Sequence, residues 1–230
     1  MKKLILATSL ALGLATGLFA DTIVPSASIG GAATGSDLFN FDALVLGSGA
    51  QTAWSTGGTS VAVSFTAPNS GVVNGSVSNM YAAPFLSGGN GLGFGSPNQP
   101  NGADATNYLT SGTGSVTLDF GVGLSYLGLL WGSVDDYNTI EFFDGLTSIG
   151  SFTGADVLAL PNGNQGPGGS VYVNFNNLDG LFTSVVLTSG TNAFEVDNFA
   201  INSVGVPDSG ATVALLGLGL IGLAAVRRKL

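Results

Sequence analysis

The chain has 230 residues with 14 acidic and 5 basic side chains, a formal net charge of −9 at pH 7, and neither histidine nor cysteine. This composition excludes Ser-His-Asp and Cys-His catalysis and the usual zinc sites, which need those side chains. The basic residues lie only at the two ends: Lys2, Lys3, Arg227, Arg228 and Lys229. The acidic body between them excludes Schiff-base chemistry on lysine and argues against nucleic acid as a partner, because phosphate contacts need a basic surface.

Residues 1–20 have the pattern of a secretory signal peptide. Two lysines precede an apolar stretch from Leu4 to Phe19, and Ala20 supplies a small residue before the expected cleavage point at Asp21. The alternative is a permanent N-terminal anchor, but the apolar stretch is shorter than a typical membrane span. We therefore expect export followed by removal of this segment.

Residues 21–204 predict one all-β ectodomain. Helix-forming residues are scarce, Gly, Asn, Ser and Thr are frequent, and short segments alternate between apolar and polar side chains. Asp144-Gly145 is a strong signal for a hairpin turn between two such segments. The expected strands are 60–65, 72–77, 115–120, 126–131, 138–143, 147–152, 171–175, 183–187 and 194–204. Many short strands joined by loops indicate an antiparallel β-sandwich of jelly-roll-like type.

Three segments of this body depart from simple alternation. The stretch from Tyr126 to Trp131 is apolar on both faces, which predicts a central buried strand. The last expected strand changes phase at Asn198-Phe199, which predicts a β-bulge. The stretch from Ser87 to Asp104 is rich in Gly, Asn and Pro, so we expect a surface loop or a crossover between sheets.

Carboxylates and amides are the residues of this body that suit a metal ion, and their hard oxygen atoms favour Ca²⁺. The candidate ligands fall in two segments: Asp135, Asp136 and Asn138, and Glu195, Asp197 and Asn198. Their spacing does not match an EF-hand loop. The alternative is surface charge that keeps the domain soluble. Calcium is the single candidate ion, and we expect no organic cofactor.

Two further hypotheses concern sugars. A glycosidase needs two carboxylates about 5–9 Å apart, and the acidic residues offer such a pair in principle, but acids at turns are usually solvated, so we expect no enzymatic activity. Trp54 lies among Ser, Gly and Thr residues and is the candidate for an exposed ring that stacks on a glycan, by analogy with jelly-roll carbohydrate-binding modules. The alternative for aromatic side chains is core packing, which we expect for Trp131 and Tyr126.

Residues 205–230 contain a three-part pattern at the C-terminus. A short polar motif is followed by an apolar segment, 211–226, and then by a basic tail, 227–230. The residues that define the pattern are Val206, Pro207, Asp208, Ser209, Gly210, Arg227, Arg228 and Lys229. As a helix the apolar segment spans about 24 Å, which makes a short membrane span with its basic end in the cytoplasm. The alternative, a buried helix of the domain, does not fit a segment that is apolar on all sides.

This pattern resembles the PEP-CTERM class of sorting signals recognised by exosortases, in its VPDSG variant. The resemblance implies that a transmembrane helix holds the chain in the inner membrane. An exosortase-like enzyme then cuts near the motif, and the protein passes to the cell surface or the extracellular matrix.

The body also resembles one family of exosortase-dependent bacterial surface proteins, on residues that include Tyr126 to Asp135, Tyr137 to Ile140 and Phe194 to Asn198. That resemblance implies export and a β-rich ectodomain, and it brings no catalytic residues. We therefore expect a structural or adhesive protein of the envelope or extracellular matrix. The alternatives are a carbohydrate-binding module held by exopolysaccharide and a carboxylate-based glycosidase.

Overall fold

The computed structural model describes residues 23–28, 31–66, 69–87, 101–177 and 180–203. The predicted signal peptide and the predicted sorting domain, with its membrane helix and basic tail, lie outside these residues. Within the described ranges, no helix has the length and apolar character needed to cross a membrane.

The described part of the chain is almost entirely β-strand. Its single helix is the short α1 (Gly154–Val157). The strands are β1 (Ile23–Ser28), β2 (Asp37–Phe39), β3 (Gln51–Trp54), β4 (Ser60–Phe65), β5 (Gly71–Asn74), β6 (Phe85–Leu86), β7 (Gly102–Ala103), β8 (Asn107–Thr110), β9 (Ser115–Gly132), β10 (Asn138–Asp144), β11 (Thr147–Thr153), β12 (Val171–Asn177), β13 (Phe182–Ser189) and β14 (Glu195–Ser203). Twelve of them form one antiparallel sheet, and β6 and β7 form a separate pair. This confirms the predicted all-β, antiparallel class.

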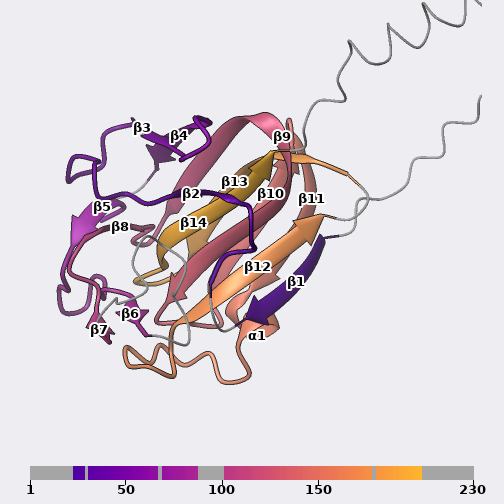
Figure 1. Cartoon of the computed structure of the whole chain (residues 1–230). Coiled ribbons are helices and arrows are strands. Elements are labelled where there is room, and N and C mark those ends of the chain that lie inside the picture. Colours follow the sequence, from indigo (N-terminus) through magenta and orange to yellow (C-terminus); the bar gives the residue numbers. More distant parts are fainter. Residues whose placement is uncertain (1–22, 29–30, 67–68, 88–100, 178–179, 204–230) are drawn as a thin grey trace, which may run out of the picture.

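Strand β9 connects two groups of strands because it pairs with four neighbours (Figure 1). Its first part, residues 115–119, pairs with β13 and β4, and through them with β10, β11 and β3. Its last part, residues 126–131, pairs with β12 and β14, and through them with β1, β2, β8 and β5. The two parts are separated by Gly121, whose φ of +64° lies in the left-handed region that favours glycine.

The main hydrophobic core draws side chains from both groups of strands. Val63 and Leu118 from the first group belong to the same buried cluster as Leu129 from the second group. The ring of Phe142 in β10 lies 5.2 Å from the ring of Phe175 in β12, so aromatic packing joins the two groups directly. Burying an apolar side chain of this size contributes about 1.5–3 kcal/mol, which makes this cluster the main source of stability in a chain without disulfides.

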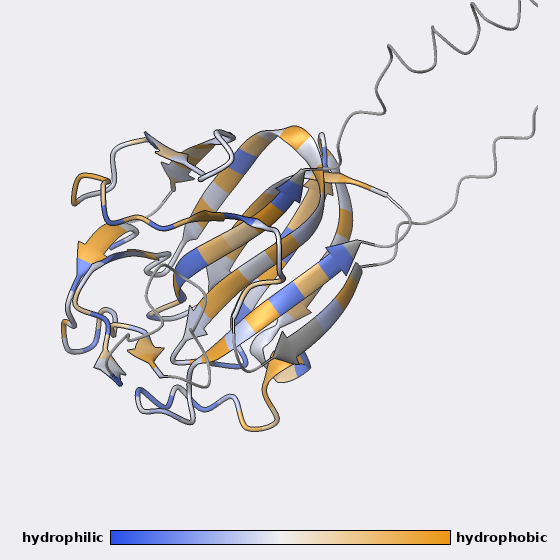
Figure 2. Cartoon of the chain, viewed as in Figure 1, coloured by the Kyte–Doolittle hydropathy of each residue, from blue (hydrophilic) through white to orange (hydrophobic). Residues whose placement is uncertain are grey.

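Several predicted elements are confirmed with small differences. The Asp144-Gly145 turn joins β10 to β11, and Gly145 has a φ of +58°. Trp131 and Tyr126 are buried, as expected for a central strand. The register of β14 against β9 shifts between Asp197 and Ala200, which confirms the predicted bulge. The hydropathy colours alternate along many strands, as the sequence pattern requires (Figure 2).

Three expectations need correction. The segments 115–120 and 126–131, expected as two strands, are parts of the single long strand β9, because Gly121 lets the backbone turn without ending the strand. The expected strand 72–77 is shorter and shifted, since β5 ends at Asn74. The described part of the expected loop 87–104 includes β7, and its last residue, Asp104, is buried rather than at the surface.

Loop segments around β6 and β7 pack against the face of β14 and β9 that is turned away from the main core. Strand alternation places Val196 in the main core and directs Glu195 and Asp197 to the opposite face. There the backbone N–H of Ala82 donates to Glu195 Oε1 at 2.9 Å, and the backbone N–H of Asp104 donates to Pro84 O at 2.8 Å. These contacts place the loops 75–84 and 104–106 over the start of β14, and the first of these loops supplies residues 76–82 to one wall of the candidate site.

Candidate functional site

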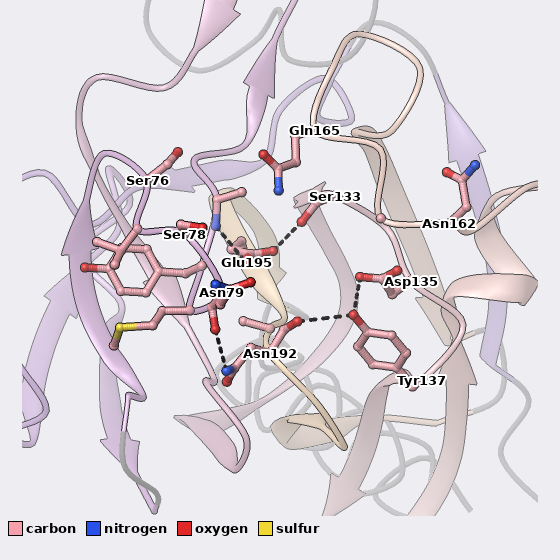
Figure 3. Close-up of a pocket in the computed structure, with 16 residues that line it drawn as sticks. Ser76, Ser78, Asn79, Ser133, Asp135, Tyr137, Asn162, Gln165, Asn192 and Glu195 are labelled. Carbon is pink, nitrogen blue, oxygen red and sulfur yellow. Dashed lines mark hydrogen bonds between the residues drawn. The ribbon is translucent and has the colours of Figure 1, made fainter.

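A polar pocket of about 580 Å³ lies where four segments of the chain meet (Figure 3). These segments are the loop 76–82 before β6, residues 133–137 after β9, the loop 162–165 and residues 192–195 at the start of β14. Most of its labelled side chains carry hydroxyl, amide or carboxyl groups that point toward the cavity. The pocket therefore suits a ligand with many hydrogen-bonding groups.

Glu195 lies at the buried side of this pocket and is only 1% exposed. Its Oε1 accepts a hydrogen bond from the backbone N–H of Ala82, and its Oε2 accepts one from the hydroxyl of Ser133 at 2.5 Å. Burial raises the pKa of Glu195 to about 7, although these hydrogen bonds act in the opposite direction. Glu195 can therefore change its protonation state near neutral pH.

Asp135 and Tyr137 form the second acidic part of the pocket. The hydroxyl of Tyr137 lies 2.6 Å from Asp135 Oδ2 and 3.2 Å from the backbone oxygen of Asn192, so these two acceptors share one donor. Burial raises the pKa of Asp135, whereas the hydrogen bond from Tyr137 favours its ionised form. The tyrosine thereby fixes the side chain of Asp135 and connects it to the segment that leads into β14.

Amide side chains complete the lining. Asn192 Nδ2 donates to the backbone oxygen of Asn79 at 2.8 Å, which connects two walls of the pocket. Asn79 has a φ of +61°, a left-handed conformation that Asn adopts more easily than most residues. Asn162 and Gln165, in the loop 162–165, line the pocket as exposed side chains. Amides can donate and accept hydrogen bonds at once, as adjacent hydroxyl groups of a ligand require.

The structure brings together only two of the six predicted calcium ligands, Asp135 and Glu195, as lining residues of the pocket. Asp136 is exposed outside it. Asn138 is buried and serves the fold, because it donates to the backbone oxygen of Ala193 at 2.9 Å and accepts from the hydroxyl of Ser189 at 2.6 Å. In the part of the chain that the structure describes, no three acidic side chains gather as ligands of a metal ion.

The other two predicted ligands lie at the bulge of β14. Asn198 is buried with a φ of +53°, so its backbone conformation helps to form the bulge. Asp197 is buried on the same face as Glu195 but is not among the residues that line the pocket. The strongest electrostatic influence on Asp197 from another side chain comes from Asp104, a residue outside the six predicted ligands.

The candidate stacking residue Trp54 is 66% exposed in β3, as expected, but it does not line the pocket. The aromatic lining residues are Tyr81 and Tyr137 instead. The loop 76–82 carries no motif that would have identified it, because its role depends on contacts with residues more than a hundred positions away, such as the bond from Ala82 to Glu195.

Comparison with known proteins places this β-rich body on an exported chain. The VPDSG-CTERM motif model matches residues 205–230. No curated protein and no solved structure matches the chain. The motif indicates an exosortase-sorted protein, and hence a protein that is exported and processed for the cell surface.

Proposed function

We propose that this protein is an adhesive component of the cell surface or extracellular matrix, and that its jelly-roll-like β-sandwich ectodomain binds a glycan in the pocket around Glu195. The observation that supports the proposal is the polar lining of a pocket of about 580 Å³ on an exosortase-sorted protein. The membrane-anchored intermediate and the cut near the motif are parts of the same proposal.

A glycan fits the chemistry of the lining. Sugar hydroxyl groups donate to carboxylates and accept from amide N–H groups, and the pocket offers both kinds of partner at Asp135, Asn162 and Gln165. Tyr81 adds an aromatic side chain to the lining of the same pocket. Small-ligand sites are usually more apolar than this pocket, so its polar lining favours a ligand that is itself rich in hydroxyl groups.

We propose binding without catalysis. A glycosidase is the second candidate, because Glu195 and Asp135 share the pocket and the pKa of Glu195 is raised to about 7, as a general acid requires. However, both carboxyl oxygens of Glu195 already accept hydrogen bonds from the protein, at Ala82 and Ser133. A glycan therefore meets Glu195 as part of a fixed wall rather than as a free acid.

The proposal is tested by affinity electrophoresis and calorimetry of the full chain in detergent against the exopolysaccharide of its own cells and a panel of soluble glycans. We expect retardation by at least one glycan. We expect Asn162→Ala and Gln165→Ala to weaken binding on the order of tenfold each, the value of one lost hydrogen bond. Both side chains are exposed, so the fold should tolerate their truncation.

Trp54→Ala is the matched control, because this exposed ring lies outside the pocket and should leave affinity unchanged. Loss of binding in Trp54→Ala with normal binding in the pocket variants would contradict the proposed site. Release of new reducing ends from a bound glycan, abolished by Glu195→Gln, would show that the protein hydrolyses the glycan and would favour the glycosidase function over binding without catalysis.

A further inference from the structure

Two buried carboxyl groups meet below the loops that cover β14. Asp197 is 1% exposed and Asp104 is 3% exposed. Their carboxyl groups lie within hydrogen-bonding reach of one another, although they come from the bulge of β14 and from the turn between β7 and β8. Two acidic side chains in contact inside a protein need a neutralising partner, since their ionised forms repel.

Each carboxyl group has one oxygen atom without a hydrogen-bond partner among the described residues. Asp104 Oδ1 accepts from the backbone N–H of Thr106 at 2.8 Å and from its hydroxyl at 2.6 Å, but Asp104 Oδ2 is buried and accepts none. Asp197 Oδ1 is likewise buried without a partner. Buried polar atoms in native proteins are normally paired, so these two oxygens indicate a missing partner, either a proton shared between the two carboxyl groups or a bound ion.

The charge around the pair favours a cation over a shared proton. One proton between Asp104 and Asp197 leaves a full negative charge in the interior, and Asp42 adds further negative potential there. The chain has no Lys, Arg or His between Lys3 and Arg227 to offset it. A buried charge without a partner is strongly unfavourable, whereas a divalent cation neutralises both carboxylates at once.

We propose that Asp104 and Asp197 bind a divalent cation, with Ca²⁺ as the ion that suits them. Their unpaired carboxylate oxygens are the hard ligands that calcium prefers, and calcium tolerates irregular coordination in which water or main-chain oxygens complete the shell. The bound ion would join the bulge of β14 to the turn after β7. This inference does not rest on glycan binding in the pocket.

The test uses the full chain purified in detergent, stripped with EGTA, and then exposed to calcium. Elemental analysis after removal of free ions should find calcium near a single ion per chain. Thermal unfolding, followed by near-ultraviolet circular dichroism, should shift upward by about 5–10 °C when free calcium is about a hundred times Kd. Asp104→Asn and Asp197→Asn should each lose the bound ion and the shift.

Asp144→Asn is the matched control, since it removes the same charge from an exposed turn. This variant should retain both the bound calcium and the upward shift in unfolding temperature. If Asp197→Asn does not fold, Asp104→Asn and the metal content of the unmodified chain still decide the matter. A stripped protein that binds no calcium and melts at one temperature with and without it would overturn the proposal and assign a shared proton to the pair. Retention of bound calcium and of the shift by Asp104→Asn would also overturn it.

Discussion

Glu195 makes the stability of the fold depend on pH in a definite direction. Burial raises its pKa from the ordinary 4.5 to about 7, so the folded state binds this proton more tightly than the unfolded state. The stability that this group contributes is complete below about pH 4.5 and is lost as the pH rises through about 7. At alkaline pH the folded protein carries the cost of a buried carboxylate, which its hydrogen bonds offset only in part.

We therefore expect Glu195→Gln to be more stable than the unmodified protein at pH 8, by about 3 kcal/mol at most. The difference should disappear near pH 4.5, because the neutral amide replaces a neutral acid there. Urea unfolding between these pH values, in buffer with a chelator, measures it. Glu141→Gln, at a partly exposed position in β10, should keep the pH dependence of the unmodified protein. If the free energy of unfolding changed with pH equally in Glu195→Gln and in the unmodified protein, this role of Glu195 would be contradicted.

At the scale of elements, β9 depends on one close approach of its backbone to two tyrosines. A Cβ atom on Gly128 would lie 2.4 Å from the hydroxyl oxygen of Tyr126 and 2.8 Å from that of Tyr172. Tyr126 cannot move away freely, because its hydroxyl donates to Asn174 Oδ1 at 2.5 Å and accepts from the backbone N–H of Ala33 at 3.0 Å. Only glycine fits here without breaking this buried network.

Gly128→Ala should lower the free energy of unfolding by about 1–3 kcal/mol through this overpacking. Denaturant unfolding monitored by tyrosine and tryptophan fluorescence measures the loss. Gly190→Ala is the control, because no atom lies within 4 Å of its added Cβ, and it should change stability little. Equal stability of the two variants would show that the tyrosines have room to shift.

The sequence predicts the elements of this fold better than their connections. Strand β4 and the hairpin of β10 and β11 follow from local alternation and from Asp144-Gly145, signals contained in a few neighbouring residues. The continuity of β9 through Gly121 was not predictable, because a glycine with positive φ also ends strands. The pairing of β9 with its four partner strands joins residues far apart in the sequence and depends on how the whole core packs.

The candidate site illustrates the same limit. Asp135 and Glu195 were identifiable as candidates, since carboxylates are the main reactive groups of the body. The hydrogen-bond partners of Glu195, Ser133 and Ala82, lie 62 and 113 positions from it, and no periodic pattern links residues so far apart. Asp104 ends a stretch rich in Gly, Asn and Pro that predicts a surface loop or a crossover between sheets, and only the packing of that turn against β14 buries it.

At the scale of the whole molecule, export and processing can be measured at the two ends of the chain. If the chain is processed as its VPDSG-CTERM motif indicates, mass spectrometry of protein recovered from the cell surface should find a chain that begins near Asp21. The same chain should lack Arg227, Arg228 and Lys229. Replacement of Pro207 and Asp208 by alanine should leave an unprocessed precursor in the membrane fraction. A surface chain that still carries the three basic residues would contradict cleavage.

The position of β14 has a mechanical consequence. The last residue of this strand, Ser203, lies two positions before the first residue of the motif match at 205–230, so a force applied at the motif reaches the domain through the end of β14. That strand is paired with β9 over most of its length and also with β2 and β8. Detaching β14 from that end therefore requires breaking its backbone hydrogen bonds to all three of these strands.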